Sequence, residues 1–431
     1  MPSGRGAALL RWRVVTPARR PLSLVAALSI MLVACSGGAE DVTPTSLAAT
    51  TTTLAPEDDV GDGRLVIGVL LPTAEPLLGT PMVEAAELAV ERINTSGGVL
   101  GRPVRVTVAD EGSSTGSALT AIQTLVEADV DAIVGPGSST IALATLDEIV
   151  SSGIVTCSPT ASALALDDFP DDDLFFRTIP SDSLQAQAIA EVADQTGALQ
   201  ASIVHVDDAY GRDLASAVES SMEGGAIAVA DTIGFTGRDD DLSDEAQQLV
   251  DSNAPVAIVL ADGEDGTRFL EALDGVDTGG LATVLVNDAF RNPTTPERIA
   301  SLDSQLRRKI VGLAPQAESN NPDQPFDPPG LFATNAYDCV NLVALAAVRA
   351  DSDDARAIAA EISFVSSSGL ACRTFNDCVN AIDDGRQIDY DGPSGLTEIG
   401  RDGDTSRAVF DRFLFNTDGE DIFDRSITVG S

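Results

Sequence analysis

The chain has few basic residues and almost no histidine, which nucleic-acid binding and histidine-dependent catalysis require. Lys309 is its one lysine and His205 its one histidine, and 67 acidic residues outnumber 26 basic ones. Phosphate binding needs clustered Lys and Arg, so we exclude nucleic acid as a partner. A lone histidine in a strand-like run argues against a serine hydrolase with a histidine base. The formal net charge of -41 indicates a strongly acidic, well-solvated surface.

Several catalytic and cofactor motifs are also missing. The loop after the first strand-like run, Gly68–Pro72, lacks the GxGxxG pattern of dinucleotide binding. The sequence GPGSST at 135–140 has neither the lysine nor the spacing of a phosphate loop. No CxxC pair is present for zinc. We therefore expect no enzymatic activity, no cofactor and no metal.

Long hydrophobic runs are scarce, and the most informative one is short. Leu22–Val33 is apolar apart from two serines, well below the ~20 residues of a membrane-spanning helix. It follows an arginine-rich segment and ends at Cys35, so residues 1–34 are typical of a secretory signal. The letters LVAC resemble a bacterial lipobox, whose cysteine receives lipid; an ordinary signal with an incidental cysteine is the alternative. We expect an extracytoplasmic protein, lipid-anchored to the bacterial cell membrane at Cys35, with a disordered tether over 35–63.

Beyond Cys35 the chain has four cysteines, an even number outside the cytoplasm, which favours disulfides. Four cysteines allow three pairings. Cys372 and Cys378 can close a bond if a helix begins near Asn376 and the chain folds back before it. The pair Cys157–Cys339 then follows by elimination.

From residue 64 onward, strand-like and helix-like runs alternate. Strands are expected at 65–71, 104–108, 132–134 and 154–156, then at 202–206, 226–233, 256–260, 283–286 and 310–313. Helices are expected at 81–94, 117–127, 140–151, 212–222, 242–251, 267–273, 333–350 and 354–364, and a final hairpin at 409–415 and 422–429.

This alternation predicts an α/β protein of two Rossmann-like lobes with parallel sheets. We expect lobe 1 to contain residues 64–182 plus 311–393, and lobe 2 to contain 183–310 plus 394–431. Three hinge crossovers would then join the lobes. Ligands of such folds bind at the carboxyl ends of the strands, so a cleft between the lobes is the expected site.

Four motifs stand out along residues 65–429: VIGVLLP, AAELAVERINTSGGVLGRPVRV, GIVTCSPTASA and HVDDAYGRDLA. Together they resemble the type I periplasmic binding proteins, the Venus-flytrap fold, and within them the branched-chain amino acid binding proteins of ABC importers. The resemblance covers nearly all of 65–429. It implies a lipoprotein that closes on a small amino acid or analogue and delivers it to ABC permease subunits.

The resemblance also implies roles for individual residues. It places a ligand carboxylate on the hydroxyl and amide groups of Ser138, Ser139, Thr160, Ala161 and Ser162. An aromatic over the cleft falls on Tyr210, an acid for the ligand's ammonium on Asp288, and an aromatic wall on Phe332.

Two positions depart from the family pattern. Leu78 and the segment Ala261–Gly263 stand where relatives often carry aromatic residues. The pocket for the ligand's side chain is therefore expected to differ, and an amide or an aromatic acid is an alternative ligand. A ligand-binding sensor subunit is the alternative to an importer.

Overall fold

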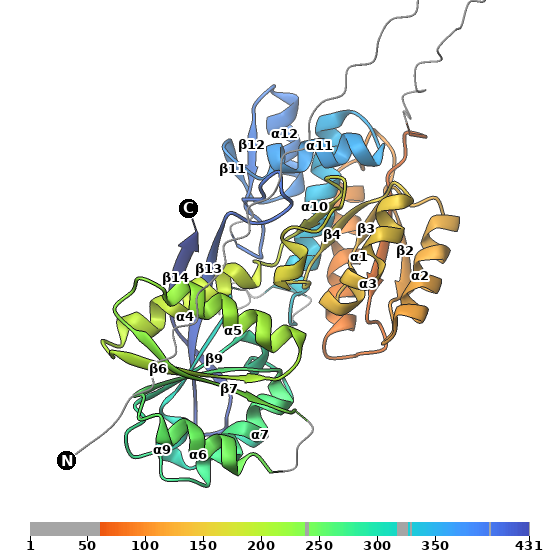
Figure 1. The fold of residues 1–431 in the computed structure, drawn as a ribbon. Coiled ribbons are helices and arrows are strands. Elements are labelled where there is room, and N and C mark those ends of the chain that lie inside the picture. Colours follow the sequence, from red (N-terminus) through yellow and green to blue (C-terminus); the bar gives the residue numbers. More distant parts are fainter. Residues whose placement is uncertain (1–60, 238–240, 317–325, 328–329, 396–397, 431) are drawn as a thin grey trace, which may run out of the picture. The chain divides into compact units, whose positions relative to one another are not determined.

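The first third of the folded chain forms a sheet of five parallel strands (Figure 1). The computed structural model describes residues 61–237, 241–316, 326–327, 330–395 and 398–430. The strand order is β2-β1-β3-β4-β5. The bounds are β1 Val66–Leu71, β2 Arg105–Asp110, β3 Ala132–Val134, β4 Val155–Ser158 and β5 Phe175–Arg177. The expected lipidation site, Cys35, lies outside the described residues, as do the signal and most of the tether.

Helices cover both faces of this sheet. They are α1 Gly79–Thr95, α2 Thr115–Glu127, α3 Ser139–Ser151, α10 Ala333–Ala350, α11 Ala355–Val365 and α12 Phe375–Asp383. Alternate residues of β1 point to opposite faces, because side chains of a strand alternate. Val69 packs in one core with α1 and α10, whereas Leu70 packs in another with α2. The chain thus returns, more than 150 residues later, to complete the first sheet's cover.

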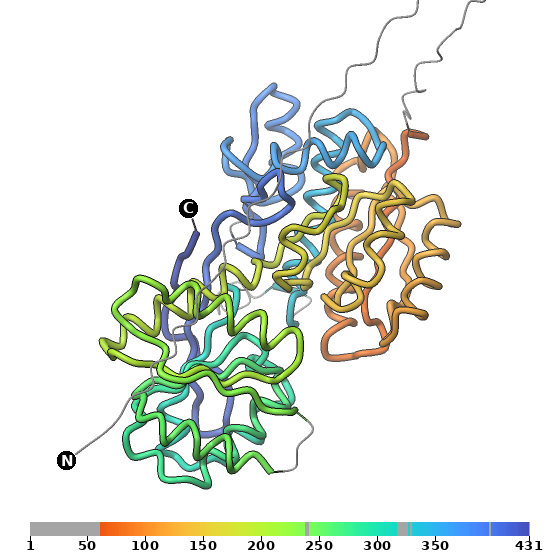
Figure 2. Tube along the Cα trace, in the orientation of Figure 1, coloured from red at the N-terminus to blue at the C-terminus, as the bar shows by residue number. Residues whose placement is uncertain are grey.

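The second sheet has seven strands in the order β14-β13-β10-β9-β8-β6-β7. The bounds are β6 Gln200–Val206, β7 Ala228–Phe235, β8 Val256–Leu260, β9 Thr283–Val286, β10 Ile310–Pro315, β13 Arg407–Phe415 and β14 Asp421–Gly430. The five strands β6 to β10 are parallel. The C-terminal hairpin joins them antiparallel through β13 and β10. In Figure 2 this blue segment can be followed into the second sheet.

Two cores sandwich the second sheet. Its helices are α4 Asp182–Gln195, α5 Ala209–Met222, α6 Ser243–Asp251, α7 Gly263–Asp274, α8 Pro296–Ser301 and α9 Ser304–Arg307. Ile258 packs with α4 and α5, and its neighbour Val259 packs with α6 and α7. The α/β architecture with parallel sheets is therefore confirmed.

The structure contains strands that the sequence did not predict, and the chain crosses between the lobes at other residues than expected. Strand β5 and the small pair β11 Leu370–Cys372 and β12 Ile388–Tyr390 were not predicted, although the equally short β3 was. Strand β10 pairs within the second sheet, so the passage back to α10 begins after Pro315 and not at residue 311. The last passage also extends beyond residue 394, because the amide of Arg177 in β5 donates to the carbonyl of Gly403.

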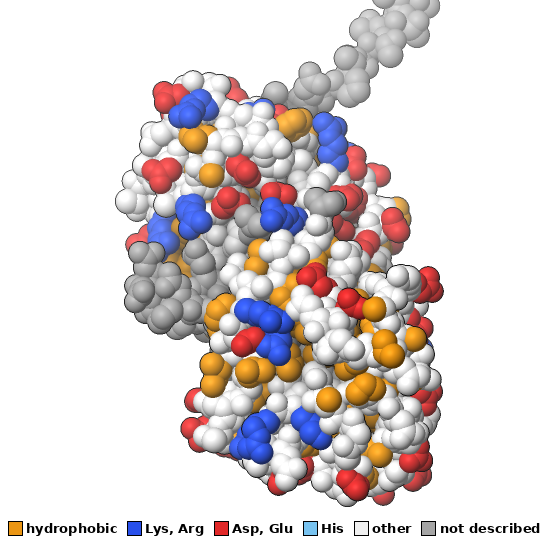
Figure 3. Space-filling model, turned by 90° about the vertical axis from the view of Figure 1, so that its left-hand side faces the viewer, with side chains coloured by type: hydrophobic (Ala, Val, Ile, Leu, Met, Phe, Trp, Pro, Cys, Tyr) orange, Lys and Arg blue, Asp and Glu red, His pale blue; other side chains and the backbone are white. Residues whose placement is uncertain are grey.

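Both expected disulfides are present. Cys157 of β4 is bonded to Cys339 of α10, which fastens this helix to the sheet. Cys372 is bonded to Cys378, where α12 begins at Phe375 and the chain folds back as the spacing suggested. Across the described ranges, every helix is too short or too polar to cross a membrane. Acidic side chains are scattered over the face drawn in Figure 3, with basic side chains among them.

Candidate functional site

Two loops at the carboxyl ends of β3 and β4 are tied together by hydroxyl groups. The hydroxyl of Ser158, which is fully buried, donates to the carbonyl oxygen of Pro136 at 2.7 Å. The hydroxyl of Thr160 donates to the carbonyl oxygen of Gly137 at 2.5 Å. The amide of Ala161 in turn donates to the Ser158 hydroxyl at 3.0 Å. Residues expected to hold a carboxylate thus lie on one edge of the first sheet.

The two serines of the first loop stand at the start of α3. The hydroxyl of Ser138 accepts from the amide of Ile141 at 3.4 Å and caps the helix. The hydroxyl of Ser139 accepts from the amide of Ala163 at 3.3 Å and joins the second loop. A helix N-terminus has free amides and a partial positive charge, both of which favour an anion.

A buried acid supports the same loop from beneath. Glu111 follows β2 and is 1 % exposed. Its Oε2 accepts from the amide of Gly137 at 2.7 Å, and the amide of Ser138 also bonds to the carboxylate. Burial raises the pKa of Glu111 from 4.5 to about 7, although the two amide bonds oppose this rise. Glu111 therefore holds the loop in place while titrating near neutrality.

Arg177 holds the second loop from the neighbouring strand β5. Its guanidinium donates to the carbonyl oxygens of Ala161 and Ala163, at 3.2 and 3.3 Å. It also pairs with Asp167 and with Asp404, the latter through Nε at 2.5 Å. The side chain of Arg177 has no exposed surface. A charge at such depth is retained only with this complete set of partners.

Asp182, the first residue of α4, connects the loop to the second lobe. Its amide donates to the carbonyl oxygen of Ser162 at 2.9 Å, and the two side chains are also hydrogen bonded. Asp182 is 2 % exposed. Burial raises its pKa well above the ordinary value, and the negative charge of Asp288 raises it further.

Asp288 opens the short helix η2, Asp288–Phe290, after β9. Burial raises the pKa of its carboxyl, and a hydrogen bond from the side chain of Gln185 lowers it in part. Tyr210 is near enough to both acids to feel their charge. Burial raises the pKa of its phenol well above the ordinary value, and the negative charges of Asp182 and Asp288 raise it further. The side-chain Nδ2 of Asn287 donates to the phenol oxygen at 3.3 Å.

Phe332 shares a cavity of about 310 Å³ with Asp288. The backbone of Phe332 has φ 57°, in the left-handed region, directly before α10. A bulky residue seldom adopts this conformation, which costs on the order of 1 kcal/mol. The eight expected ligand residues therefore fall into two groups. Five lie on the two loops of the first sheet. Tyr210 and Asp288 lie near Asp182, and Phe332 shares the cavity with Asp288.

A family model described as "Periplasmic binding protein" matches residues 65–298, more than half of the chain. The chain belongs to the periplasmic binding protein family. Within it the architecture is that of the type I proteins. Members bind solutes, so this is a binding protein and not an enzyme, and the family acts outside the cytoplasm.

One curated protein and two solved structures illustrate what this chain is similar to. "Leu/Ile/Val-binding protein homolog 3" of Brucella melitensis is 25% identical over 323 residues, 68% of this chain and 82% of the relative. An ABC transporter substrate-binding protein of Desulfitobacterium hafniense, solved with Leu, has a TM-score of 0.64 and 21% identity, covering 84% of this chain and 99% of that one. A solute-binding protein of R. palustris, solved with benzoate, has a TM-score of 0.62 and 16% identity, covering 86% and 98%.

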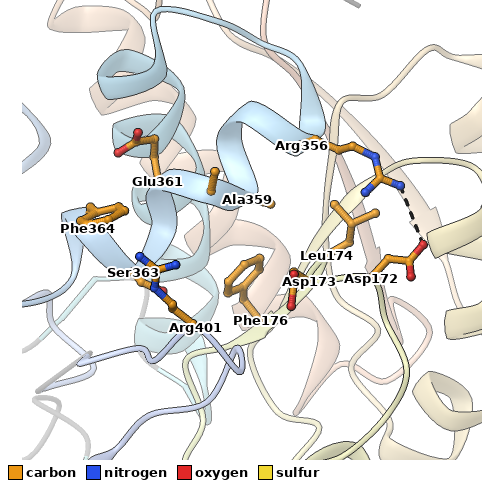
Figure 4. A pocket seen from close by; sticks show the side chains of 11 residues that line it. Asp172, Asp173, Leu174, Phe176, Arg356, Ala359, Glu361, Ser363, Phe364 and Arg401 are labelled. Carbon is orange, nitrogen blue, oxygen red and sulfur yellow. Dashed lines mark ion pairs between the residues drawn. The ribbon is translucent and has the colours of Figure 1, made fainter. Parts of the chain in front are cut away.

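This binding protein also has a larger hollow that contains none of the expected ligand residues. It measures about 490 Å³ and lies between α11 and the residues before and within β5 (Figure 4). Its wall includes Phe364, Arg401 and the wide ion pair of Arg356 with Asp172 at 3.8 Å. Both members of that pair are largely exposed. Nothing here provides a set of convergent polar groups like the one around Asp182 and Asp288.

Sequence reasoning missed three residues around the site. Asp182 follows a capping serine, so the sequence alone indicates a helix start or a hinge at this position. Glu111 resembles the many other loop acids, and Arg177 lies in strand β5, which the sequence did not predict. In the sequence, these three residues are marked only by being charged residues next to apolar segments. That pattern does not show whether a charged side chain is buried.

Proposed function

We propose that this protein is the solute-binding lipoprotein of an ABC importer, held at the cell membrane through lipid on Cys35. Its ligand has an α-amino acid frame and binds between the two lobes. The observation that carries this proposal is the pair of buried Asp182 and half-buried Asp288, which stands near Tyr210 and is joined through Ser162 to the loops of hydroxyls and amides.

The two ends of a zwitterion match the two sides of this site. The α-carboxylate would lie at the start of α3, near Ser138 and Ser139, and against the turn formed by Thr160, Ala161 and Ser162. Amides and hydroxyls bonded to an ionised group form the stronger, charge-assisted hydrogen bonds.

The α-ammonium would face Asp288 and Asp182 and restore the ionised state of these acids. Without a cation, two neighbouring acids in a poorly hydrated place disfavour each other's charge. Phe332 would form the wall beside the ligand's side chain. A ligand that touches both sides favours the closed arrangement of the lobes, which is the basis of hinge closure.

A thermal-shift screen tests this ligand class. The purified protein is heated with single α-amino acids, with amides and with aromatic acids such as benzoate. A ligand at about 100 times its Kd adds about 2.7 kcal/mol of stability. A shift with α-amino acids supports the proposal. A shift confined to aromatic acids contradicts it, because such ligands carry no ammonium for Asp288.

The lipid anchor and the transport role need separate tests in cells. Cells given a labelled fatty acid should label the wild-type protein and not Cys35→Ala, which should be released from the membrane. Labelling of the variant would refute lipidation at this residue. Deletion of the gene should abolish uptake of the identified ligand; unchanged uptake with a lost cellular response would identify a sensor subunit instead.

A further inference from the structure

The buried guanidinium of Arg177 has an acceptor for each of its N–H groups. Nη1 donates to the carbonyl oxygens of Ala161 and Ala163, at 3.2 and 3.3 Å. Nε and Nη2 donate to the two carboxylate oxygens of Asp404, at 2.5 and 2.9 Å. Nη2 donates to Asp167 as well. A guanidinium holds its five donors in one rigid plane, so Arg177 cannot turn without breaking several of these bonds.

The two carbonyl groups that Nη1 binds lie on either side of Ser162, in the turn where the ligand's carboxylate is expected. The carbonyl oxygen of Ser162 accepts from the amide of Asp182, the first residue of α4, at 2.9 Å, and their side chains are also hydrogen bonded. Arg177 therefore holds this turn from the first sheet, while Asp182 contacts it from the second lobe. The side chain of Arg177 has no exposed surface, so the ligand itself does not touch it.

The bond to Asp167 extends this arrangement to the crossover that leads into α4. Both carboxylate oxygens of Asp167 accept from the hydroxyl of Ser181, at 2.8 and 2.9 Å. Ser181 is 2 % exposed, and its hydroxyl caps α4 by accepting from the amide of Ser183. The first turn of α4 is thus linked to Arg177 through a single carboxylate.

The bond to Asp404 extends it to the crossover that leads into β13. The carbonyl oxygen of the neighbouring Gly403 accepts from the backbone amide of Arg177 at 3.0 Å. Gly403 has φ 82°, and a Cβ atom there would lie 2.0 Å from the carbonyl oxygen of Phe175, so this close approach to β5 requires glycine. The chain is therefore held against β5 until three residues before β13 begins at Arg407.

These bonds make one side chain common to the ligand turn and to two of the crossovers. Hinge closure changes the direction of the crossovers relative to the first lobe, because the crossovers join the two lobes. A buried donor that loses its acceptor is unfavourable, so the guanidinium follows its partners when they move. The position of the turn that suits a bound ligand is thereby favoured together with one arrangement of the crossovers.

We propose that Arg177 is a positioning residue that couples the ligand turn, Ala161–Ala163, to the crossovers, so that ligand binding and closure of the lobes favour each other. The inference rests on the proposed function, because it takes this turn as part of the ligand site. Ligand affinity should then depend on Asp404 and Asp167, although neither residue lines the cavity beside Asp288.

Calorimetric titration and small-angle X-ray scattering of the purified protein test this coupling. The wild type is titrated with each standard L-amino acid, and the one that binds most tightly is the probe for every variant. Asp404→Asn should weaken binding of the probe by about tenfold or more, a usual size for coupling between sites, because its amide group cannot accept from the guanidinium. At a saturating concentration, the probe should reduce the radius of gyration of this variant less than that of the wild type.

A second variant and a matched control accompany Asp404→Asn. Asp167→Asn acts on the other carboxylate, which is 26% exposed, and should change affinity and compaction in the same direction. Glu361→Gln is the control, because Glu361 pairs with Arg349 at 2.5 Å and is also 26% exposed, but lines the hollow of Figure 4. The control should bind the probe and become compact as the wild type does.

Urea unfolding of the ligand-free variants separates coupling from a merely structural role. A structural role lowers the free energy of unfolding of Asp404→Asn and Asp167→Asn but leaves the Kd and the compaction of the folded protein as in the wild type. That result would overturn the inference and leave the proposed function intact. A wild type that binds the probe without compaction would also overturn the coupling. A wild type that binds none of the amino acids would overturn the proposed function itself.

Discussion

The carboxyl of Asp182, at the start of α4, is close enough to Asp288 for the charge of Asp288 to raise its pKa. The two acids come from segments more than 100 residues apart in the chain. Asp182 is 2 % exposed. Such a pair is unfavourable while both members are ionised, and it becomes favourable when a cation arrives.

The first prediction concerns the pH dependence of binding. In the free protein the pKa of Asp182 is well above its ordinary value, and a bound ammonium would lower it. Binding below the free-state pKa must therefore release a proton, and affinity should rise with pH until the pair is ionised. Calorimetry in buffers of different ionisation enthalpy measures the protons released. Equal heats in all buffers, with affinity independent of pH, would refute this coupling.

The second prediction concerns Asp288. Asp288→Ala should weaken binding of an amine-bearing ligand by about 3 kcal/mol or more, because an ammonium would be buried without its partner. The fold should persist, since Asp288 lies in a short loop helix. Asp147→Ala removes the same charge from an exposed position of α3 and should bind as the wild type does. Equal affinities of the two variants would exclude the zwitterion arrangement.

Asp182→Asn should separate stability from binding. The folded-state pKa of Asp182 is raised, so the acid opposes folding at pH values above its unfolded pKa. The variant should therefore increase the free energy of unfolding of the ligand-free protein at neutral pH and weaken ligand binding. Urea denaturation with and without ligand measures both effects. Loss of stability in the ligand-free variant would contradict the unfavourable burial.

The raised pKa of Glu111 should make the stability of the protein depend on pH. Its pKa rises from 4.5 to about 7 on folding, so the folded state holds a proton that the unfolded state releases between these values. Stability from this group is fully present below pH 4.5 and is lost, by about 3 kcal/mol, as pH rises to about 7.

Glu111→Gln should remove that loss and keep the bond to Gly137, because the amide oxygen can still accept. The variant should equal the wild type in acid and exceed it in stability above pH 7. Urea unfolding at a series of pH values compares the two slopes. Parallel slopes would mean that Glu111 keeps its ordinary pKa.

The two disulfides should differ in their effect on stability. Cys157–Cys339 spans 182 residues, whereas Cys372–Cys378 spans 6. A longer closed loop restricts the unfolded chain more, so replacing the first pair with alanine should cost about 2–5 kcal/mol and replacing the second should cost less. Thermal unfolding of both double variants provides the comparison. A larger loss on removal of Cys372–Cys378 would contradict the entropic account.

Much of the fold could be predicted because its elements are local. Strands such as Val256–Leu260 are short continuous apolar runs, and helices such as Gly79–Thr95 repeat their buried residues at helical spacing. Strand β5 was missed although β3, which also has three residues, was predicted: Ala132–Val134 is apolar throughout, whereas Phe175–Arg177 ends in a charged residue. Both disulfides could be predicted as well, since a short spacing favoured Cys372–Cys378 and elimination left the other pair.

The sequence by itself determined the α/β class, the order of the elements, the strong acidity and the residue types available at the strand ends. Only the tertiary structure decided which acids are buried. Asp182, Glu111 and Asp288 look like many other acids in this chain, and their raised pKa values come from burial by distant segments. The same holds for Arg177, whose partner Asp404 is more than 200 residues away. Hydration and Coulomb energies depend on neighbours in space, and a local pattern of residues carries no information about them.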